Sequence, residues 1–231
     1  MKSIKFRDIF FDLDHTLWDF DRNSELAFTA IFDLHGVQLE LQEFLSVYMP
    51  LNLNYWKRYR ENKVTKETLR LGRLRDTFEN LGYCVPEQKI KLLAEEYIRY
   101  LPRHNHLYEG VLETLEHLLP HYRLHIITNG FEEVQHEKLR ASGIRSYFDT
   151  VTTSEEAGCK KPHRRIFELA LEKAGASKDY SLMVGDDFEA DIQGAKQVGM
   201  QAVYLNYKGE IADEGFPQIT RMRQLWDFLK K

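Results

Sequence analysis

Phe-Phe-Asp-Leu-Asp-His-Thr, residues 10–16, is the stretch from which the fold of this chain can be predicted. Residues 4–11 are rich in apolar and β-favouring side chains, so they predict a buried strand. Asp12 and Asp14 follow where this strand would leave its sheet. Open α/β sheets bind ligands at the carboxyl ends of their strands, which favours a functional site here. Aspartate is also common in turns, and a plain strand exit is the alternative.

The composition excludes several classes of protein. The chain has 231 residues, 43% of them hydrophobic, with a net charge of -4, so there is no basic excess to attract nucleic acid or a membrane surface. Cys84 and Cys159 are its only cysteines, which predicts no disulfide framework. The N-terminal residues lack a signal-peptide pattern and no apolar run reaches membrane-spanning length. We therefore expect a cytoplasmic protein that binds neither nucleic acid nor membrane.

Helical periodicity follows the first strand for about ninety residues, with no strand between the helices. Four helices are predicted near residues 24–36, 41–59, 65–81 and 86–100. Asn23 or Ser24 is expected to cap the first helix, and Pro50 is expected to break or kink the second. We predict that residues 17–106 form a separate α-helical domain.

Strands and helices alternate from residue 107 onward. Strands are predicted at residues 123–128, 149–153, 181–185 and 201–205, and helices at residues 111–119, 132–142, 163–174, 190–198 and 222–229. This alternation predicts a parallel, doubly wound sheet with right-handed crossovers. The predicted fold is therefore an α/β core, residues 1–16 and 107–231, interrupted by the helical insert.

Polar groups accompany four segments of the predicted core. They are Asp12-Leu-Asp14-His-Thr16, Thr128-Asn129-Gly130, Lys160-Lys161-Pro162 and Gly185-Asp186-Asp187-Phe-Glu-Ala-Asp191. The third group begins a predicted helix, with Pro162 in its first turn. Because the strand ends of such a sheet meet at one edge, we expect these groups to share one crevice.

These four motifs, in this order, resemble those of the haloacid dehalogenase superfamily of phosphohydrolases that use an aspartate nucleophile. The helical insert after the first motif is similar to the α-helical cap of that superfamily, whose core is Rossmann-like. Ile-Thr-Asn-Gly-Phe, Ser-Glu-Glu-Ala-Gly and the Asp-Phe-Asp of residues 19–21 are similar to the 5'-nucleotidase-like subgroup. The resemblance spans nearly the whole chain.

Hydrolysis of a phosphate monoester requires a nucleophile, neutralisation of charge and a proton for the leaving oxygen. A carboxylate can serve as the nucleophile by forming an aspartyl-phosphate. The resemblance implies that Asp12 is this nucleophile. It implies that Asp14 is the general acid for the leaving alcohol and then the base for water. Thr16 is expected to brace the turn.

Several carboxylates in one crevice repel one another unless a cation joins them, and a hard cation such as Mg²⁺ prefers oxygen ligands. The resemblance places Mg²⁺ on Asp12, on the backbone carbonyl of Asp14 and on Asp186. Asp191 is implied to order metal-bound water from outside the ligand set. Asp187 is either a further outer carboxylate or a helix cap.

The remaining site residues implied by the resemblance bind phosphate. They are the hydroxyl of Thr128, the backbone amide of Asn129 and the ammonium of Lys161. Lys161 is also expected to reduce repulsion between Asp12 and Asp186.

The first functional hypothesis is a Mg²⁺-dependent phosphatase of a small phosphomonoester, with a nucleoside 5'-monophosphate as the preferred substrate. The alternatives are a phosphatase of a sugar phosphate or phosphoglycolate, a phosphosugar mutase, and a non-catalytic relative. Dehalogenation needs no second acid, so Asp14 argues against it. Aromatic residues of the insert, such as Tyr48, Tyr55 and Trp56, could stack on a base, although most are expected to form the core of the insert.

Overall fold

The computed structural model describes residues 6–207, 209 and 215–230. Ile4, which the sequence places in the first strand, lies outside the described residues. The chain divides into two compact units, Met1–Phe20 with Asn105–Lys231 and Asp21–His104. The sequence instead places the ends of the insert at residues 17 and 106.

The first unit is built on a six-stranded sheet in the order β3-β2-β1-β4-β5-β6. The strands are β1 (Asp8–Phe11), β2 (Arg123–Thr128), β3 (Thr150–Thr153), β4 (Ser181–Gly185), β5 (Gln201–Leu205) and β6 (Gln218–Ile219). Each strand pairs with its neighbours in parallel. The order reverses at β1, because β2 and β3 lie on one side of it and β4 to β6 on the other. This confirms the predicted doubly wound fold, and a ligand is expected at such a reversal point.

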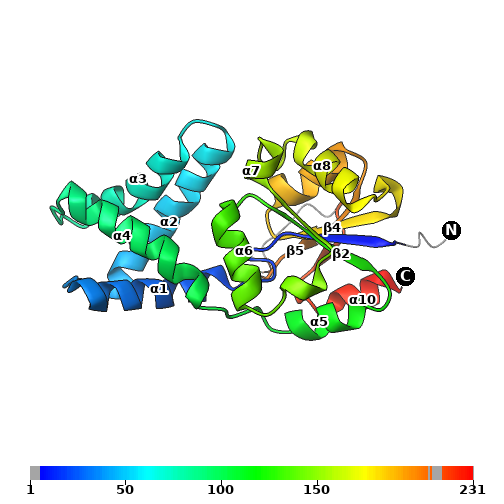
Figure 1. The fold of residues 1–231 in the computed structure, drawn as a ribbon, viewed down its shortest axis with the longest axis horizontal. Helices are drawn as coiled ribbons and strands as arrows, with labels where there is room; N and C mark the ends of the chain where they lie inside the picture. Colours follow the sequence, from blue (N-terminus) through cyan, green and yellow to red (C-terminus); the bar gives the residue numbers. More distant parts are fainter. Residues whose placement is uncertain (1–5, 208, 210–214, 231) are drawn as a thin grey trace. The chain divides into compact units, whose positions relative to one another are not determined.

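Helices cover both faces of this sheet. They are α5 (Val111–Leu118), α6 (Glu132–Ala141), α7 (Ser154–Ala157), α8 (Arg164–Ala174), α9 (Gly194–Gln197) and α10 (Gln224–Leu229). Figure 1 shows α5 and α10 on one side of the strands and α7 and α8 on the other. Phe10, Ile127 and Met183 of three adjacent strands pack against Ile166 and Phe167 of α8, all with no exposed surface. Their burial removes apolar surface from water, which stabilises the sheet.

The second unit contains helices only. They are α1 (Phe20–His35), which begins at the boundary, α2 (Leu41–Arg60), α3 (Lys66–Asn80) and α4 (Glu87–Tyr100). Its core is aromatic: Phe28 stacks on Tyr97 and meets Phe44 and Tyr48 edge-on. Tyr48 and Tyr55 are both buried, as expected for core residues of the insert.

The expected cap of the first helix is wrong, and so is one of the two outcomes expected at Pro50. Asn23 and Ser24 do not cap α1, because the helix begins at Phe20 and both side chains are buried within it. Ser24 bonds to the hydroxyl of Tyr97 instead. Of the two outcomes expected at Pro50, the break is wrong, because α2 continues through it to Arg60, and the kink stays a prediction. None of the helices in the described part of the chain is long and apolar enough to cross a lipid bilayer.

The segment after β4 differs most from its prediction. The sequence predicts one α-helix over residues 190–198, whereas a π-helix occupies Phe188–Gln193 and α9 follows it. The short elements α7 and β6 are not predicted from the sequence at all. π-Helical turns are rare and often occur at functional sites. This one carries Asp191, one of the predicted site residues.

Candidate active site

The candidate site lies at the carboxyl ends of three neighbouring strands. Asp12 follows the last residue of β1, Asp186 follows the last residue of β4, and Thr128 is the last residue of β2. Phe11 pairs with Val184 and with Ile126, so these strand ends lie at similar heights in the sheet. Parallel pairing therefore brings Asp12 close to groups that lie more than a hundred residues further along the chain.

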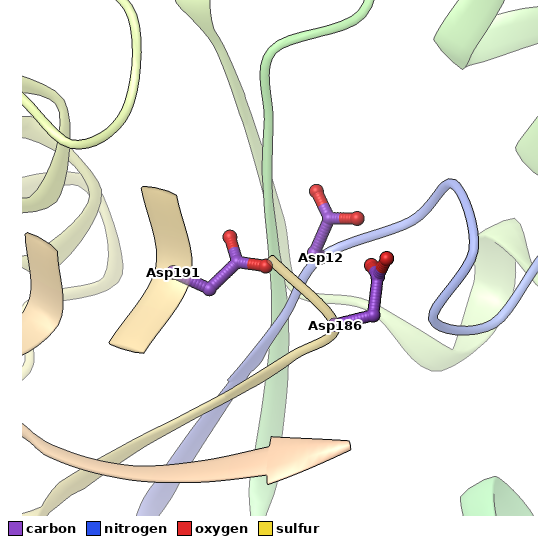
Figure 2. Close-up of side chains that lie close together, drawn as sticks. All are labelled: Asp12, Asp186 and Asp191. Carbon is purple, nitrogen blue, oxygen red and sulfur yellow. The ribbon is translucent and has the colours of Figure 1, made fainter. Parts of the chain in front are cut away.

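Three carboxylates form a cluster at this edge (Figure 2). Asp12, Asp186 and Asp191 each offer an oxygen, and these oxygens lie within 4.8 Å of one another. Asp12 and Asp191 are buried, and Asp186 is partly buried. Gly185 makes room for the third carboxylate, because a Cβ at this position would overlap the side chain of Asp191. The sequence places Asp191 outside the ligand set, whereas its carboxylate lies within this cluster.

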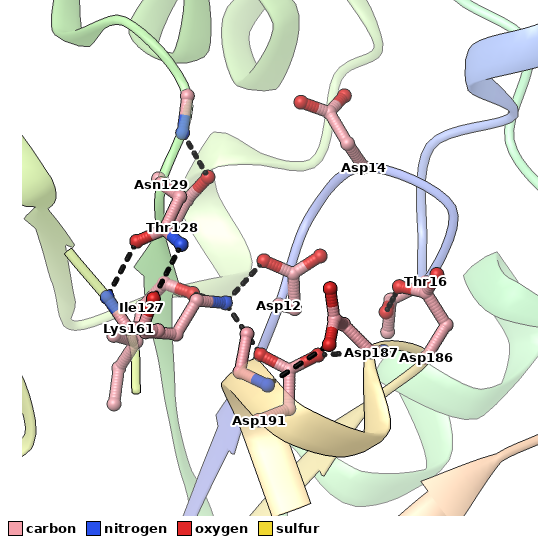
Figure 3. Close-up of polar contacts among 12 residues, drawn as sticks. Asp12, Asp14, Thr16, Ile127, Thr128, Asn129, Lys161, Asp186, Asp187 and Asp191 are labelled. Carbon is pink, nitrogen blue, oxygen red and sulfur yellow. Dashed lines mark hydrogen bonds and ion pairs between the residues drawn. The ribbon is translucent and has the colours of Figure 1, made fainter. Parts of the chain in front are cut away.

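Lys161 is the cation that joins two of these carboxylates (Figure 3). Its Nζ lies 2.5 Å from Asp12 Oδ1, 2.6 Å from Asp191 Oδ1 and 2.8 Å from the carbonyl oxygen of Ile127. The side chain is only 2% exposed. An ammonium has three protons, and these three acceptors use all of them. Asp12 and Asp191 thus share the ammonium of Lys161, and the expected effect of Lys161 on the repulsion between Asp12 and Asp186 stays a prediction.

The buried carboxyl groups resist ionisation. Burial raises the pKa of Asp12 to about 7, although Lys161 opposes the shift, and the charges of Asp191 and Asp14 add to it. Burial, followed by the charges of Asp12 and Asp191, raises the pKa of Asp186 well above its usual value. Burial disfavours the charge of Lys161 as well, but Asp12 and Asp191 outweigh this effect and raise its pKa.

The donor set of this cluster fits a hard divalent cation. Three carboxylates and one ammonium carry a net charge of -2 when all are ionised, which a divalent cation would balance. Carboxylate oxygens are the ligands that Mg²⁺ prefers, and Mg²⁺ commonly uses only one or two carboxylates. Asp12 and Asp186 lie at adjacent strand ends, while Asp191 is already bonded to Lys161.

Asn129 connects two of the predicted motifs through its side chain. Its Oδ1 accepts a hydrogen bond of 2.7 Å from the backbone N–H of Lys161, and its Nδ2 donates one of 3.1 Å to the backbone oxygen of Lys161. The sequence predicts a role only for the backbone amide of Asn129. The side chain has a further role, because it fixes the loop that carries Lys161 beside the end of β2.

Asp14 lies apart from the carboxylate cluster (Figure 3). It has two partners on α6. Its Oδ1 lies 2.5 Å from Lys138 Nζ, and its Oδ2 accepts a hydrogen bond of 3.1 Å from Gln135 Nε2. Lys138 is 2% exposed and lies over the ring of Trp18, 4.2 Å from its centroid. Asp14 keeps partial access to solvent, with 23% of its side chain exposed.

Thr16 and Asp187 have supporting positions. Thr16 donates a hydrogen bond of 2.8 Å to Asp186 Oδ1, so the hydroxyl of the first motif orients a carboxylate of the fourth. Asp187 Oδ1 accepts a hydrogen bond of 2.9 Å from the backbone N–H of Ala190 and so caps the π-helix. Of the two alternatives for Asp187, the structure favours the helix cap.

The match to a family model decides the relationship of this chain to known proteins. Residues 7–199 match the model of the haloacid dehalogenase-like hydrolases. The chain belongs to this family. As a haloacid dehalogenase-like hydrolase it is an enzyme, and the resemblance drawn from its four motifs is confirmed.

Two relatives of this hydrolase are similar over most of its length. Pyrimidine 5'-nucleotidase PynA of Streptococcus pneumoniae is 33% identical over 203 residues, which are 87% of this chain and 84% of the relative. Pyrimidine 5'-nucleotidase YjjG of Escherichia coli is 34% identical over 208 residues, 90% of this chain and 89% of the relative. Among solved structures, the HAD-hydrolase YfnB of Bacillus subtilis, bound to magnesium, has a TM-score of 0.89 and 26% identity, covering 98% of this chain and 100% of its own.

Sequence reasoning missed Gln135 and Lys138 as residues of this hydrolase's site. They are one turn apart on α6, which begins two residues after Gly130 of the second motif. A signal was present: both are polar, yet they lie on the same side of the helix as the buried Leu139. Polar side chains on the buried stripe of a helix are uncommon unless they have partners.

Proposed function

We propose that this hydrolase is a Mg²⁺-dependent phosphatase that acts on a small phosphomonoester through an aspartyl-phosphate on Asp12. The observation that carries the proposal is the cluster of Asp12, Asp186 and Asp191, in which Lys161 is bonded to Asp12 and Asp191, with Asp14 close to Asp12 in the chain. A nucleophilic carboxylate, a nearby carboxylate that can exchange protons, and a site for a divalent cation are the parts that phosphoryl transfer requires.

In the first half of the proposed reaction, an oxygen of Asp12 attacks phosphorus and the ester oxygen leaves. Asp14, which must carry a proton when the ester binds, donates it to that leaving oxygen and becomes the carboxylate that Lys138 and Gln135 hold. In the second half, Asp14 accepts a proton from water, and this water attacks the phosphorus of the acyl phosphate and releases Asp12. The partial exposure of Asp14 suits this task, because the group must meet both a leaving alcohol and water.

The other site residues are proposed to bind the phosphate group and to neutralise charge in the site. The hydroxyl of Thr128 and the backbone N–H of Asn129 are proposed to donate to phosphate oxygens. Lys161 holds Asp12 and Asp191 in place and offsets their charge. A bound Mg²⁺, held by Asp12, Asp186 and the backbone carbonyl of Asp14, would supply the charge that neutralises the phosphate. Asp191 is proposed to act beside this ligand set through its bond to Lys161.

A nucleoside 5'-monophosphate is the proposed substrate. Its support is the similarity to two pyrimidine 5'-nucleotidases over most of the chain. The Ile-Thr-Asn-Gly-Phe and Ser-Glu-Glu-Ala-Gly segments, at residues 127–131 and 154–158, point to the same subgroup.

The test is a panel of phosphate esters that includes nucleoside 5'-monophosphates, sugar phosphates and phosphoglycolate. We expect phosphate release that requires Mg²⁺, stops with a chelator and is fastest for a pyrimidine nucleotide. Asp12→Asn should abolish release, because an amide cannot form the acyl phosphate. Release with Asp12→Asn at the wild-type rate would remove Asp12 from the mechanism. Faster release from sugar phosphates would overturn the proposed substrate alone, and folded protein that hydrolyses no ester would overturn the activity.

A further inference from the structure

The side chain of Gln135 connects two groups that the proposed reaction uses. Its Nε2 donates a hydrogen bond of 3.1 Å to Asp14 Oδ2 and one of 2.6 Å to Thr128 Oγ1. A side-chain amide nitrogen has two protons, and these two acceptors use both of them. A carboxylate only accepts hydrogen bonds, so the amide must turn its nitrogen, not its oxygen, toward Asp14. The orientation of Gln135 is therefore fixed by Asp14.

The hydroxyl of Thr128 is oriented as a result. Its oxygen accepts the bond from Gln135 and a second one, of 3.1 Å, from the backbone N–H of Gly130. A hydroxyl has two acceptor positions and one proton, so both acceptor positions are occupied and the proton remains to donate. A donor at this position suits a phosphate oxygen. Gly130 leaves space for this arrangement, because a Cβ there would overlap the amide of Gln135.

Lys138 holds the second oxygen of Asp14. Its ammonium lies 2.5 Å from Asp14 Oδ1 and over the rings of Trp18 and Phe20, with centroid distances of 4.2 and 5.2 Å. Lys138 is almost completely buried and cannot move into solvent without losing these ring contacts. One carboxylate oxygen is thus bound to Lys138 and the other to Gln135, which restricts the rotation of the Asp14 side chain.

We propose that Gln135 and Lys138 are positioning residues that hold Asp14 where it can protonate the leaving oxygen, and that Gln135 also directs the hydroxyl of Thr128 toward phosphate. The inference rests on the proposed phosphatase function. It adds to the proposed mechanism two residues of α6 that affect the reaction by positioning Asp14 and Thr128. An ion pair that only stabilises the fold is the alternative explanation for Lys138.

The leaving group separates these explanations. A nitrophenolate leaves readily as an anion, whereas the alkoxide of a nucleoside needs a proton as it departs. The experiment measures kcat/KM of wild type and Lys138→Met with p-nitrophenyl phosphate and with the alkyl phosphate that wild type hydrolyses fastest. We expect Lys138→Met to lose about 100-fold with the alkyl phosphate and less than about 10-fold with p-nitrophenyl phosphate. A loss of equal size with both esters, or no loss, would overturn the proposal.

Two further variants make the result specific. In an Asp14→Asn background, Lys138→Met should cause no further loss with the alkyl phosphate, because groups that act as a unit are not additive. Lys173→Met is the matched control, since Lys173 forms a partly exposed ion pair of 2.6 Å with Glu156, and neither residue has a role in the proposed reaction. It should leave kcat/KM unchanged for both esters.

The design also covers a variant that fails to fold. If Lys138→Met is unfolded by circular dichroism, Gln135→Met tests the same positioning, because it removes both donors at similar length. Thr128 loses its partner as well, so KM should rise for both esters while the alkyl phosphate still loses more in kcat/KM. Wild-type protein that hydrolyses neither ester would overturn the proposed function itself, whereas active wild type with equal losses in the variants would overturn the positioning roles alone.

Discussion

Replacing Lys161 with methionine removes the ammonium that Asp12 and Asp191 share, while a side chain of similar length still fills the space. Lys161 is 2% exposed and donates to Asp12, Asp191 and the carbonyl oxygen of Ile127 at 2.5 to 2.8 Å. After the substitution, two buried carboxylates lose their counter-charge and one buried carbonyl loses its donor. The free energy of unfolding should therefore fall.

The size of this loss follows from the burial of the pair. Removing one partner of a buried ion pair typically costs about 3–5 kcal/mol, and Lys161 serves two carboxylates, so we expect about 5 kcal/mol at alkaline pH. Asp12 has a pKa raised to about 7, mainly by burial, so its native form binds a proton more tightly than the unfolded chain does. Its contribution to stability is complete below the ordinary pKa of about 4 and is lost as the pH rises through about 7.

The pH dependence gives this prediction a second, independent test. The charge of Lys161 lowers the pKa of Asp12, so Lys161→Met should raise that pKa further. At low pH the carboxyl groups can take up protons and become neutral, which removes most of the penalty for losing the ammonium. The variant should therefore lose less stability at about pH 5 than at about pH 8.

Urea unfolding in the presence of a chelator measures both effects, with wild type and variant compared at the two pH values. Lys173→Met is the control, because its ion pair with Glu156 has a similar length, 2.6 Å, but is about one-third exposed on both sides. Such a pair contributes about 0–1 kcal/mol. The reasoning would be refuted if Lys161→Met cost no more than Lys173→Met at alkaline pH, or if its cost were the same at both pH values.

Two further predictions concern groups beside the cluster. Gly130→Ala should lower kcat about 10- to 100-fold with little change in stability, because its Cβ would push the flexible amide of Gln135 away from its partners. Steady-state kinetics measure the first effect and thermal unfolding the second. An unchanged kcat would contradict the prediction. Buried His125 bonds to Asp8 at 3.1 Å and Thr150 at 2.9 Å, and burial lowers its pKa although Asp8 opposes the shift. The stability that depends on neutral His125 is therefore present above about pH 6.5 and is lost below it. In urea unfolding, the free energy of unfolding of His125→Gln should fall less on acidification than that of wild type. If the two free energies fall in parallel with pH, this prediction is contradicted.

The sequence predicts the strands of this fold well because a parallel strand is buried on both faces. Residues 123–128, 181–185 and 201–205 are predicted as strands, and β2, β4 and β5 have these same bounds. Such strands are short apolar runs bounded by polar residues, and the polar residues at the ends of β2 and β4 belong to the candidate site. The pattern that predicts where a strand ends therefore also predicts which residues lie at the site.

The errors arise where tertiary packing overrides local preference. Ser24 is a good helix cap by type, but its hydroxyl bonds to Tyr97 from inside α1. The segment after β4 has an ordinary helical pattern, yet it forms a π-helix. Asp191, within this turn, bonds to Lys161 at 2.6 Å and accepts a bond of 3.0 Å from the backbone N–H of Asp187. The contact with Lys161 joins residues that are far apart in the chain, whereas the contact with Asp187 is local. The periodicity of the sequence does not predict contacts of the first kind.

The bonds of Lys161 restrict how phosphate can bind at this site. Its three protons already go to Asp12, Asp191 and Ile127, so a phosphate oxygen that approaches it must compete with these acceptors. The ion pair of Asp14 with Lys138 adds no net charge, so the cluster of Asp12, Asp186, Asp191 and Lys161 carries an unbalanced charge of -2 once its three carboxyl groups are ionised. A phosphate dianion would therefore be repelled by the protein alone. In the proposed phosphatase, substrate affinity should depend on the divalent cation more than on Lys161. The positive charge of Lys161 is already offset by Asp12 and Asp191, so the cation would supply the charge that attracts the phosphate.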